Sequence, residues 1–170
     1  MAFVNLQVNL ADLPAVRELK MEPMSPDYIR EVKTQLLIIW PPLLMVAFIP
    51  SVLSGQVFLL AIPALLLLLA LLISALVIKE ARIKGIALRD HDIASRSGLF
   101  WRKTILLAFD RVQHVEVSSG PLQRKYGLAS LKFFTAGGSG VDLKVDGLQR
   151  QRAEQIRAYI LEKSVAKSAA

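Results

Sequence analysis

The sequence contains no cysteine among its 170 residues. This absence excludes disulfide bridges, thiolate zinc sites, iron–sulfur clusters and cysteine nucleophiles. It leaves the redox compartment open, because a chain without thiols is compatible with either side of a membrane. Histidine is also scarce, with two residues, so few side chains offer metal ligation or general base chemistry.

Charged side chains are absent from residues 34–78, between Lys33 and Lys79. A hydrocarbon core of about 30 Å needs about 20 apolar residues per helix, so this stretch accommodates two spans. A turn-forming and mildly polar segment, from Pro50 to Gln56, divides it. We predict a transmembrane hairpin with helices near 34–54 and 57–78. The second helix is apolar on every side, whereas a helix of that length in a soluble protein would show one polar face.

Cations flank the hairpin at its two outer ends and are absent from its turn. Arg30 and Lys33 precede the first helix, and Lys79, Arg82 and Lys84 follow the second. The positive-inside rule then places both termini in the cytoplasm. We therefore expect a multi-pass membrane protein whose hairpin turn faces the opposite side.

After Lys79 the chain changes to short segments in which apolar and polar residues alternate. Such alternation is typical of antiparallel strands with one buried face. In GVDLKVDG, for example, Val141, Leu143 and Val145 are expected to face a core. An open sheet of this size would leave edges exposed, which favours a small barrel or a bent sheet. We predict strands near 81–88, 92–98, 102–108, 111–118, 128–135 and 140–145.

An amphipathic helix is predicted to close the chain. Asp146 and Gln149 have the spacing of a capping box, and Leu148, Ile156 and Ile160 repeat along one helical face. The predicted class is α+β: a two-helix transmembrane hairpin, then an antiparallel β-barrel or bent sheet capped by the C-terminal helix. The predicted parts are an N-terminal cytoplasmic segment (1–33), the hairpin (34–78), a cytoplasmic domain (79–163) and a frayed tail (164–170).

Four short motifs in the domain resemble a known family. They are Ser97-Gly98-Leu99, Phe109-Asp110-Arg111-Val112-Gln113, Gly120-Pro121-Leu122-Gln123 and Tyr126-Gly127-Leu128. The resemblance is to bacterial pleckstrin-homology-like (PH-like) domain membrane proteins of the YdbS type. It implies a bacterial inner or cell membrane and seven strands capped by a C-terminal helix. Six strands are counted above, so the seventh is expected nearer the membrane or in irregular form. The fold alone does not imply phosphoinositide binding.

The sequence offers no constellation for catalysis. His114 and Glu116 have the spacing of a polar pair on one strand face, and GGSG at 137–140 lacks the lysine of a phosphate loop. His91, between Asp90 and Asp92, is most simply part of a polar hairpin turn. We therefore predict no catalytic, metal-binding or cofactor-binding residues, no cofactor, and a protein that is not an enzyme.

Positive charge is concentrated after the hairpin. From Lys79 onward the chain has 17 Lys and Arg against 9 Asp and Glu, whereas residues 1–33 hold 4 against 5. A domain tethered beside an anionic leaflet meets lipid before any other anion, and each juxtamembrane cation contributes about 1 kcal/mol there. We therefore favour membrane lipids as partners over nucleic acid.

Strand counting from the end of the hairpin predicts which turns face the membrane. Gly98 to Lys103 and Gly120 to Gly127 are expected to be proximal, and the turns at 89–92, 108–111 and 136–140 distal. Aromatic rings beside cations suit the headgroup region. The alternative is that Trp101 and Tyr126 belong to the core and the cations form an ordinary solvated face. The candidate lipid or partner interface comprises Phe100, Trp101, Arg102, Lys103, Arg124, Lys125 and Tyr126.

The leading functional hypothesis is a non-enzymatic subunit of a membrane assembly, acting through protein or anionic-lipid contacts of its cytoplasmic domain. The alternative is an accessory subunit of a membrane enzyme or transporter. Small residues on the second helix suit close helix packing, so a homo-oligomer is expected, or a complex with a partner chain. The resemblance implies a larger companion that carries related PH-like domains.

Overall fold

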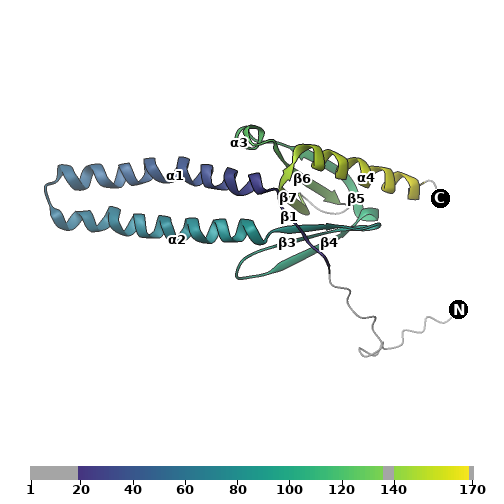
Figure 1. Ribbon diagram of the computed structural model, residues 1–170, viewed down its shortest axis with the longest axis horizontal. Helices are drawn as coiled ribbons and strands as arrows, with labels where there is room; N and C mark the ends of the chain where they lie inside the picture. Colours follow the sequence, from purple (N-terminus) through teal and green to yellow (C-terminus); the bar gives the residue numbers. More distant parts are fainter. Residues whose placement is uncertain (1–18, 136–139, 169–170) are drawn as a thin grey trace, which may run out of the picture.

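A computed structural model describes residues 19–135 and 140–168. Figure 1 shows a long helical hairpin at one end and, at the other, two antiparallel sheets with a helix alongside. The predicted α+β class, with two apolar helices before antiparallel sheets and a C-terminal helix, is therefore confirmed.

The hairpin consists of α1 (Pro26–Leu53), the short 3₁₀ helix η2 (Val57–Leu60) and α2 (Ala61–Ile83). Both long helices are long and apolar enough to cross a membrane. Both helices extend beyond the predicted ones at their outer ends, since α1 begins at Pro26 and α2 ends at Ile83. Ser25 caps the start of α1 by accepting a hydrogen bond from the Asp27 amide. The charge-free stretch therefore lies within the two helices and the turn between them, and does not mark their outer ends.

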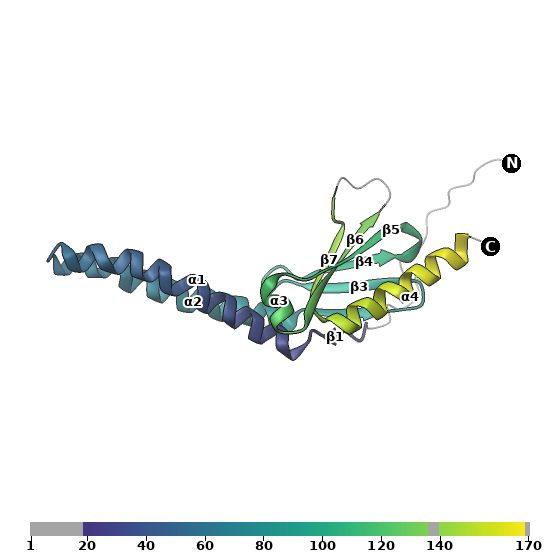
Figure 2. The ribbon, with the colours of Figure 1, turned by 90° about the horizontal axis from the view of Figure 1, so that it is seen from above.

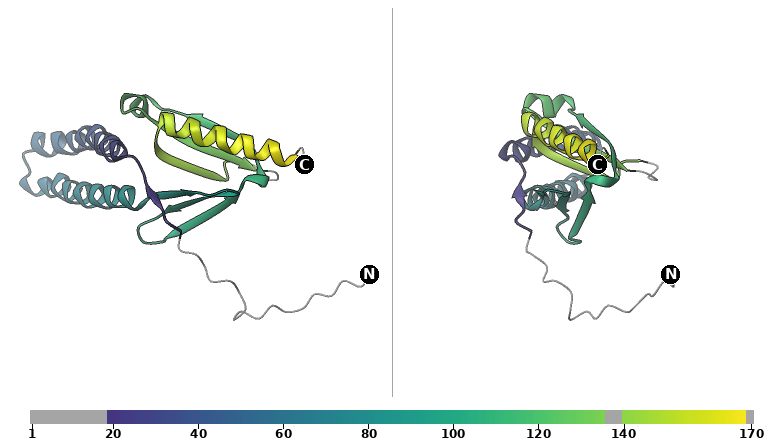
Figure 3. Two further views of the ribbon diagram at one scale, coloured as in Figure 1. Left: turned by 45° about the vertical axis from the view of Figure 1, so that its right-hand side comes forward. Right: turned by 90° about the vertical axis from the view of Figure 1, so that its right-hand side faces the viewer.

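The strands form two sheets. The four-stranded sheet has the order β1 (Glu22–Pro23), β2 (Gly85–Leu88), β3 (Asp92–Ser97) and β4 (Lys103–Ala108). The three-stranded sheet has the order β5 (Val112–Ser118), β6 (Leu128–Thr135) and β7 (Leu143–Gln149). The 3₁₀ helix η3 (Phe109–Arg111) joins the sheets, and α3 (Pro121–Lys125) joins β5 to β6. Figure 3 shows the sheets as two layers, with α4 (Arg150–Ser168) along the β5–β7 layer.

Strand β1 comes from the segment before the hairpin. Its two residues pair with β2, Glu22 opposite Ile86 and Pro23 opposite Gly85. The next residues along the chain, Met24, Tyr28 and Val32, belong to the same hydrophobic core as the sheets. The domain is thus built from both sides of the hairpin, whereas the predicted boundaries at 33 and 79 followed the charges.

The predictions for Val141, Asp146 and Leu148, in and just before β7, were wrong. Strand β7 continues through Gln149, so Asp146 lies in a strand and does not cap a helix, and Leu148 is a buried strand residue. Gly147 has φ +83° and the β6–β7 register shifts nearby, which lets the strand bend and go on. Leu143 and Val145 are buried as expected, but Val141 is 45% exposed.

Helix α4 completes the core. Its residues Ala153, Ile156 and Ile160 are at most 1% exposed, and the Tyr159 ring meets Phe109 edge-on at a centroid distance of 6.2 Å. Figure 2 shows α4 running beside the strands, away from the hairpin. The helix reaches Ser168, beyond the predicted start of a frayed tail. Full burial of each large apolar side chain contributes about 1.5–3 kcal/mol, so α4 is integral to the domain.

Candidate membrane-facing site

Two connecting segments lie at the end of the domain from which the hairpin projects. They are the β3–β4 turn and α3, while the β2–β3 turn and η3 lie at the opposite end (Figure 1). This arrangement agrees with the strand-counting prediction. Of the predicted distal loop at 136–140, residues 136–139 lie outside the described residues.

The β3–β4 turn exposes two aromatic rings. Phe100 is 72% exposed and Trp101 is 88% exposed, with ring centroids 6.4 Å apart in an edge-on arrangement. The turn depends on Gly98, which has φ +92°; a β-carbon there would lie 2.0 Å from the Trp101 carbonyl oxygen. Trp101 therefore does not belong to the core, and the turn exposes apolar surface at the end of the domain from which the helical hairpin projects.

Four exposed cations lie at this end of the domain. Arg102 and Lys103 follow the two rings directly in the chain, whereas Arg124 and Lys125 lie in α3, on the other side of the helical hairpin (Figure 1). Within residues 19–135 and 140–168, none of the four makes a salt bridge. Their charge is therefore free to act on an external anion.

Tyr126 occupies a different environment. It is partly buried and packs against the core, and its hydroxyl lies 2.7 Å from Thr34 Oγ1 in α1. Since Thr34 Oγ1 also donates to the Arg30 carbonyl, at 3.0 Å, Tyr126 is the donor to Thr34. Tyr126 thus holds α3 against α1 and positions Arg124 and Lys125, while its own hydroxyl is already used.

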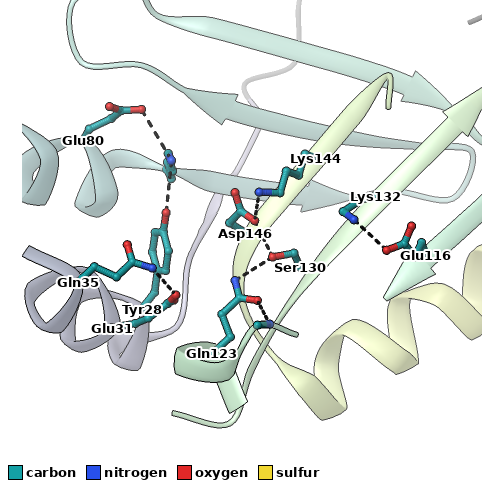
Figure 4. A network of polar contacts seen from close by, with 12 residues as sticks. Tyr28, Glu31, Gln35, Glu80, Glu116, Gln123, Ser130, Lys132, Lys144 and Asp146 are labelled. Atoms are coloured by element: carbon teal, nitrogen blue, oxygen red, sulfur yellow. Dashed lines mark hydrogen bonds and ion pairs between the residues drawn. The ribbon is translucent and has the colours of Figure 1, made fainter. Parts of the chain in front are cut away.

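A polar network connects α3 to strands β6 and β7 (Figure 4). Gln123 Nε2 donates to Ser130 Oγ at 2.9 Å, and Ser130 Oγ donates to Asp146 Oδ1 at 2.6 Å. Gln123 Oε1 also accepts from the Gly120 amide at 3.1 Å, and Lys144 Nζ lies 3.0 Å from Asp146 Oδ1. The sequence did not predict this network, because its members come from α3, β6 and β7.

The end of α2 is held by a second set of contacts (Figure 4). Lys84 Nζ donates to the Tyr28 hydroxyl at 3.3 Å and lies 3.8 Å from Glu80 Oε1. Burial lowers the pKa of Lys84, but Tyr28 and Glu80 outweigh it and raise that pKa above its usual value. The contacts join α2 to the first turn of α1 at the level where both helices meet the domain.

Glu31 is a buried carboxylate at the same junction, with 2% of its surface exposed. Its Oε1 accepts from Gln35 Nε2 at 2.9 Å, and Oε2 is buried without a partner in the described structure. Glu31 is one of two acidic residues among the four charged residues of the segment 27–33, so the sequence gives no signal for its burial.

The sequence candidates for chemistry are engaged in ordinary contacts. Arg89 forms an ion pair with Asp92 across the β2–β3 turn, and the His114 ring lies 5.7 Å from that of Phe134. Glu116 accepts from Lys132 Nζ at 2.8 Å. In the part of the chain that the structure describes, no three His, Asp or Glu side chains gather as a metal site.

Comparison with known proteins decides the family. A family model described as bacterial PH domain matches residues 35–164. The chain belongs to the bacterial PH domain family. The UPF0699 transmembrane protein YdbS of Bacillus subtilis (strain 168) is 28% identical over 151 residues, covering 85% of this chain and 93% of that protein. This bacterial PH domain protein is therefore membrane-associated, and the predicted resemblance to the YdbS type is confirmed.

A solved structure also resembles the chain. It is the crystal structure of a DUF1696 family protein with a pleckstrin-homology domain from Shewanella loihica PV-4. The TM-score is 0.38 at 13% sequence identity, over 48% of this chain and 70% of that one.

Proposed function

We propose that this PH domain protein is a non-catalytic subunit of a membrane assembly whose domain docks on anionic headgroups. Docking uses a surface that we term the rim, made of Phe100, Trp101, Arg102, Lys103, Arg124 and Lys125. The observation that carries the proposal is the exposed aromatic pair Phe100 and Trp101, followed directly in the chain by Arg102 and Lys103, at the end of the domain that adjoins the spans. Helix α3 brings Arg124 and Lys125 to the same end of the domain, on the other side of the spans.

The magnitudes favour such docking. Each cation near an anionic leaflet contributes about 1 kcal/mol, and aromatic rings partition to the membrane interface. The hairpin already tethers the domain to the membrane. Docking of the rim therefore costs only the entropy of orienting the domain, and not the entropy of bringing it to the membrane from bulk water. Weak individual contacts are then sufficient to set the orientation of the domain.

A cytoplasmic location for both termini is part of the proposal. It rests on the cations that flank the hairpin and on the anionic character of the cytoplasmic leaflet. A reporter that is active only in the cytoplasm, fused after Ala170, is expected to be active. Activity of a periplasmic or extracellular reporter at that position would overturn this topology.

We further propose that the chain works beside a second copy or a companion that carries related PH-like domains. A groove of about 510 Å³ lies between the spans, walled by Pro41, Phe48, Pro63 and Leu67 among others, and offers a seat for another transmembrane helix. Mass measurement of the protein extracted in mild detergent is expected to show a complex. Single chains under every mild condition would contradict this.

The docking test uses the full-length chain, because Met24, Tyr28 and Val32 complete the core from the other side of the hairpin. The protein is placed in nanodiscs of phosphatidylcholine with increasing phosphatidylglycerol, and hydrogen exchange of residues 98–103 and 121–126 is measured. Protection is expected to rise with the anionic fraction and to fall with added salt.

The decisive variant replaces Arg102, Lys103, Arg124 and Lys125 with alanine, and its protection is expected to lose this lipid dependence. The control replaces Arg111 in η3 and Lys163 in the C-terminal half of α4, both exposed cations outside the rim, and is expected to behave as the wild type. Protection that ignores lipid charge in the wild type, or survives in the rim variant, would overturn the proposal.

A further inference from the structure

A groove of about 500 Å³ lies between the end of α2 and the β3–β4 hairpin. It is lined by Ile83, the last residue of α2, and by Arg96, Gly98, Arg102 and Thr104. This volume is within the range of small-ligand sites, about 300–1,000 Å³. The groove is distinct from the apolar one between the spans, because two arginines line it.

Strand register places the polar side chains on one face. Arg96 in β3 lies directly opposite Thr104 in β4, and Ser97 lies opposite Lys103. Side chains alternate along a strand, so Lys103 lies on the face opposite to Thr104. Arg102 precedes β4 and lines the groove together with Arg96 and Thr104. Two guanidinium groups and one hydroxyl therefore line the same groove.

The positive charge of this groove is not compensated by the chain. Arg96 also lines a smaller cavity of about 160 Å³, whose wall includes the acidic residues Glu80 and Asp146. Each of these acids already faces a lysine, Lys84 at 3.8 Å and Lys144 at 3.0 Å. Across the described residues, neither Arg96 nor Arg102 takes part in a salt bridge. An anion from outside is the missing counter-charge.

The lining chemistry selects a phosphate. The planar fork of arginine matches phosphate oxygens with two parallel hydrogen bonds, and a threonine hydroxyl can donate a further one. Gly98 has no side chain, so it contributes only backbone atoms to the lining of the groove. Ile83 adds an apolar wall, which suits a phosphate that carries a hydrocarbon group more than a free ion.

The position along α2 gives the depth. The charge-free stretch ends before Lys79, and Ile83 lies four residues further on. At 1.5 Å per residue this is about 6 Å beyond the hydrocarbon edge. The headgroup layer of each leaflet is about 5–8 Å thick, so the groove lies at headgroup level.

We propose that this groove binds the phosphate of a phospholipid headgroup, with Arg96 and Arg102 on the phosphate oxygens and Ile83 against the glycerol. This site rests on the proposed docking at the membrane. The groove binds one lipid headgroup through defined contacts, whereas the rim attracts anionic lipids through its overall positive charge. Arg96 is outside the rim, so it tests the groove separately.

The experiment titrates delipidated full-length protein in a nonionic detergent with dihexanoyl phosphatidylglycerol. The background variant Trp40→Phe leaves Trp101, three residues from Gly98, as the fluorescent reporter. Arg96→Gln is expected to weaken binding at least tenfold, and Arg96→Lys at least threefold, because lysine keeps the charge but loses the fork. Arg82→Gln, an exposed α2 cation outside the groove lining, is expected to stay within twofold of the wild type.

Three outcomes would overturn the site: wild-type affinity in Arg96→Lys, an equal loss in Arg82→Gln, or displacement of the lipid by inorganic phosphate at equal concentration. Thermal unfolding checks that each variant is folded, and Arg96→Lys supplies the answer if Arg96→Gln is not. Lipid binding that depends on Arg96 without lipid-dependent protection of the rim would leave the groove standing and reject the docking proposal. Lipid binding that does not depend on Arg96, together with lipid-dependent protection of the rim, would reject the groove site and leave the docking proposal standing.

Discussion

The ring of Tyr28, in the first turn of α1, lies directly against the backbone of Gly147 in β7. A β-carbon at position 147 would lie 2.5 Å from Tyr28 Cγ. The Gly147 carbonyl also accepts a hydrogen bond from the Ser25 amide at 3.0 Å. The junction between the first transmembrane helix and the domain is therefore closely packed, which favours a fixed orientation of the rim relative to the spans.

Replacing Gly147 with alanine tests this packing. The positive φ costs a non-glycine residue about 1–2 kcal/mol, and the clash with Tyr28 adds about 1–3 kcal/mol. Gly127→Ala is the matched control, because Gly127 has φ +66° but nothing within 4 Å of an added β-carbon. Thermal unfolding of the full-length protein in detergent is expected to show a greater loss for Gly147→Ala. Equal losses in the two variants would contradict the close contact.

The Ser130 network predicts how α3 is held. Ser130 is 3% exposed and bridges Gln123 to Asp146, so Ser130→Ala removes a donor and an acceptor from two half-buried partners. The expected loss of stability is about 1–3 kcal/mol, with faster hydrogen exchange in residues 120–126. The control is Ser119→Ala, which removes one hydrogen bond to the Leu128 carbonyl. Unchanged exchange of α3 in Ser130→Ala would show that the network does not position it.

Glu116 predicts a pH dependence. The hydrogen bond from Lys132 lowers the pKa of Glu116 below its ordinary value of 4.5. Its contribution to stability is therefore present above about pH 4.5 and lost as the pH falls through the lowered value. The stability difference between wild type and Glu116→Gln is expected to shrink on acidification below pH 4.5, and Lys132→Met is expected to remove the same dependence. A difference that grows as the pH falls would contradict the assignment.

Much of the architecture could be predicted because it follows from one-dimensional patterns. The charge-free stretch located the spans, and alternation located the four strands β3 to β6 to within about one residue at each end. The predicted strand 81–88 was wrong at its start, because α2 continues to Ile83. Strand counting placed the Trp101 turn and Arg124 at the hairpin end. These features depend on hydrophobic periodicity, which is local in sequence.

The rest depends on contacts between distant segments. Strand β1 has two residues and no periodicity, so its pairing with Ile86 has no local signal. Asp146 matched a capping box, but Gly147 allows the strand to continue, and tertiary pairing overrode the motif. Tyr126 was expected at the interface and instead bonds to Thr34, which lies 92 residues away in sequence. The groove at Arg96 likewise needed the register of β3 and β4.

The most direct test of the account is the depth of Trp101 in a bilayer. In the Trp40→Phe background, full-length protein is placed in nanodiscs that contain lipids brominated near the headgroup, with or without phosphatidylglycerol. We predict strong quenching of Trp101 that increases with the anionic fraction and is lost when Arg102, Lys103, Arg124 and Lys125 are replaced with alanine. Trp101 fluorescence that is unquenched in both lipid mixtures would contradict docking of the rim at the membrane.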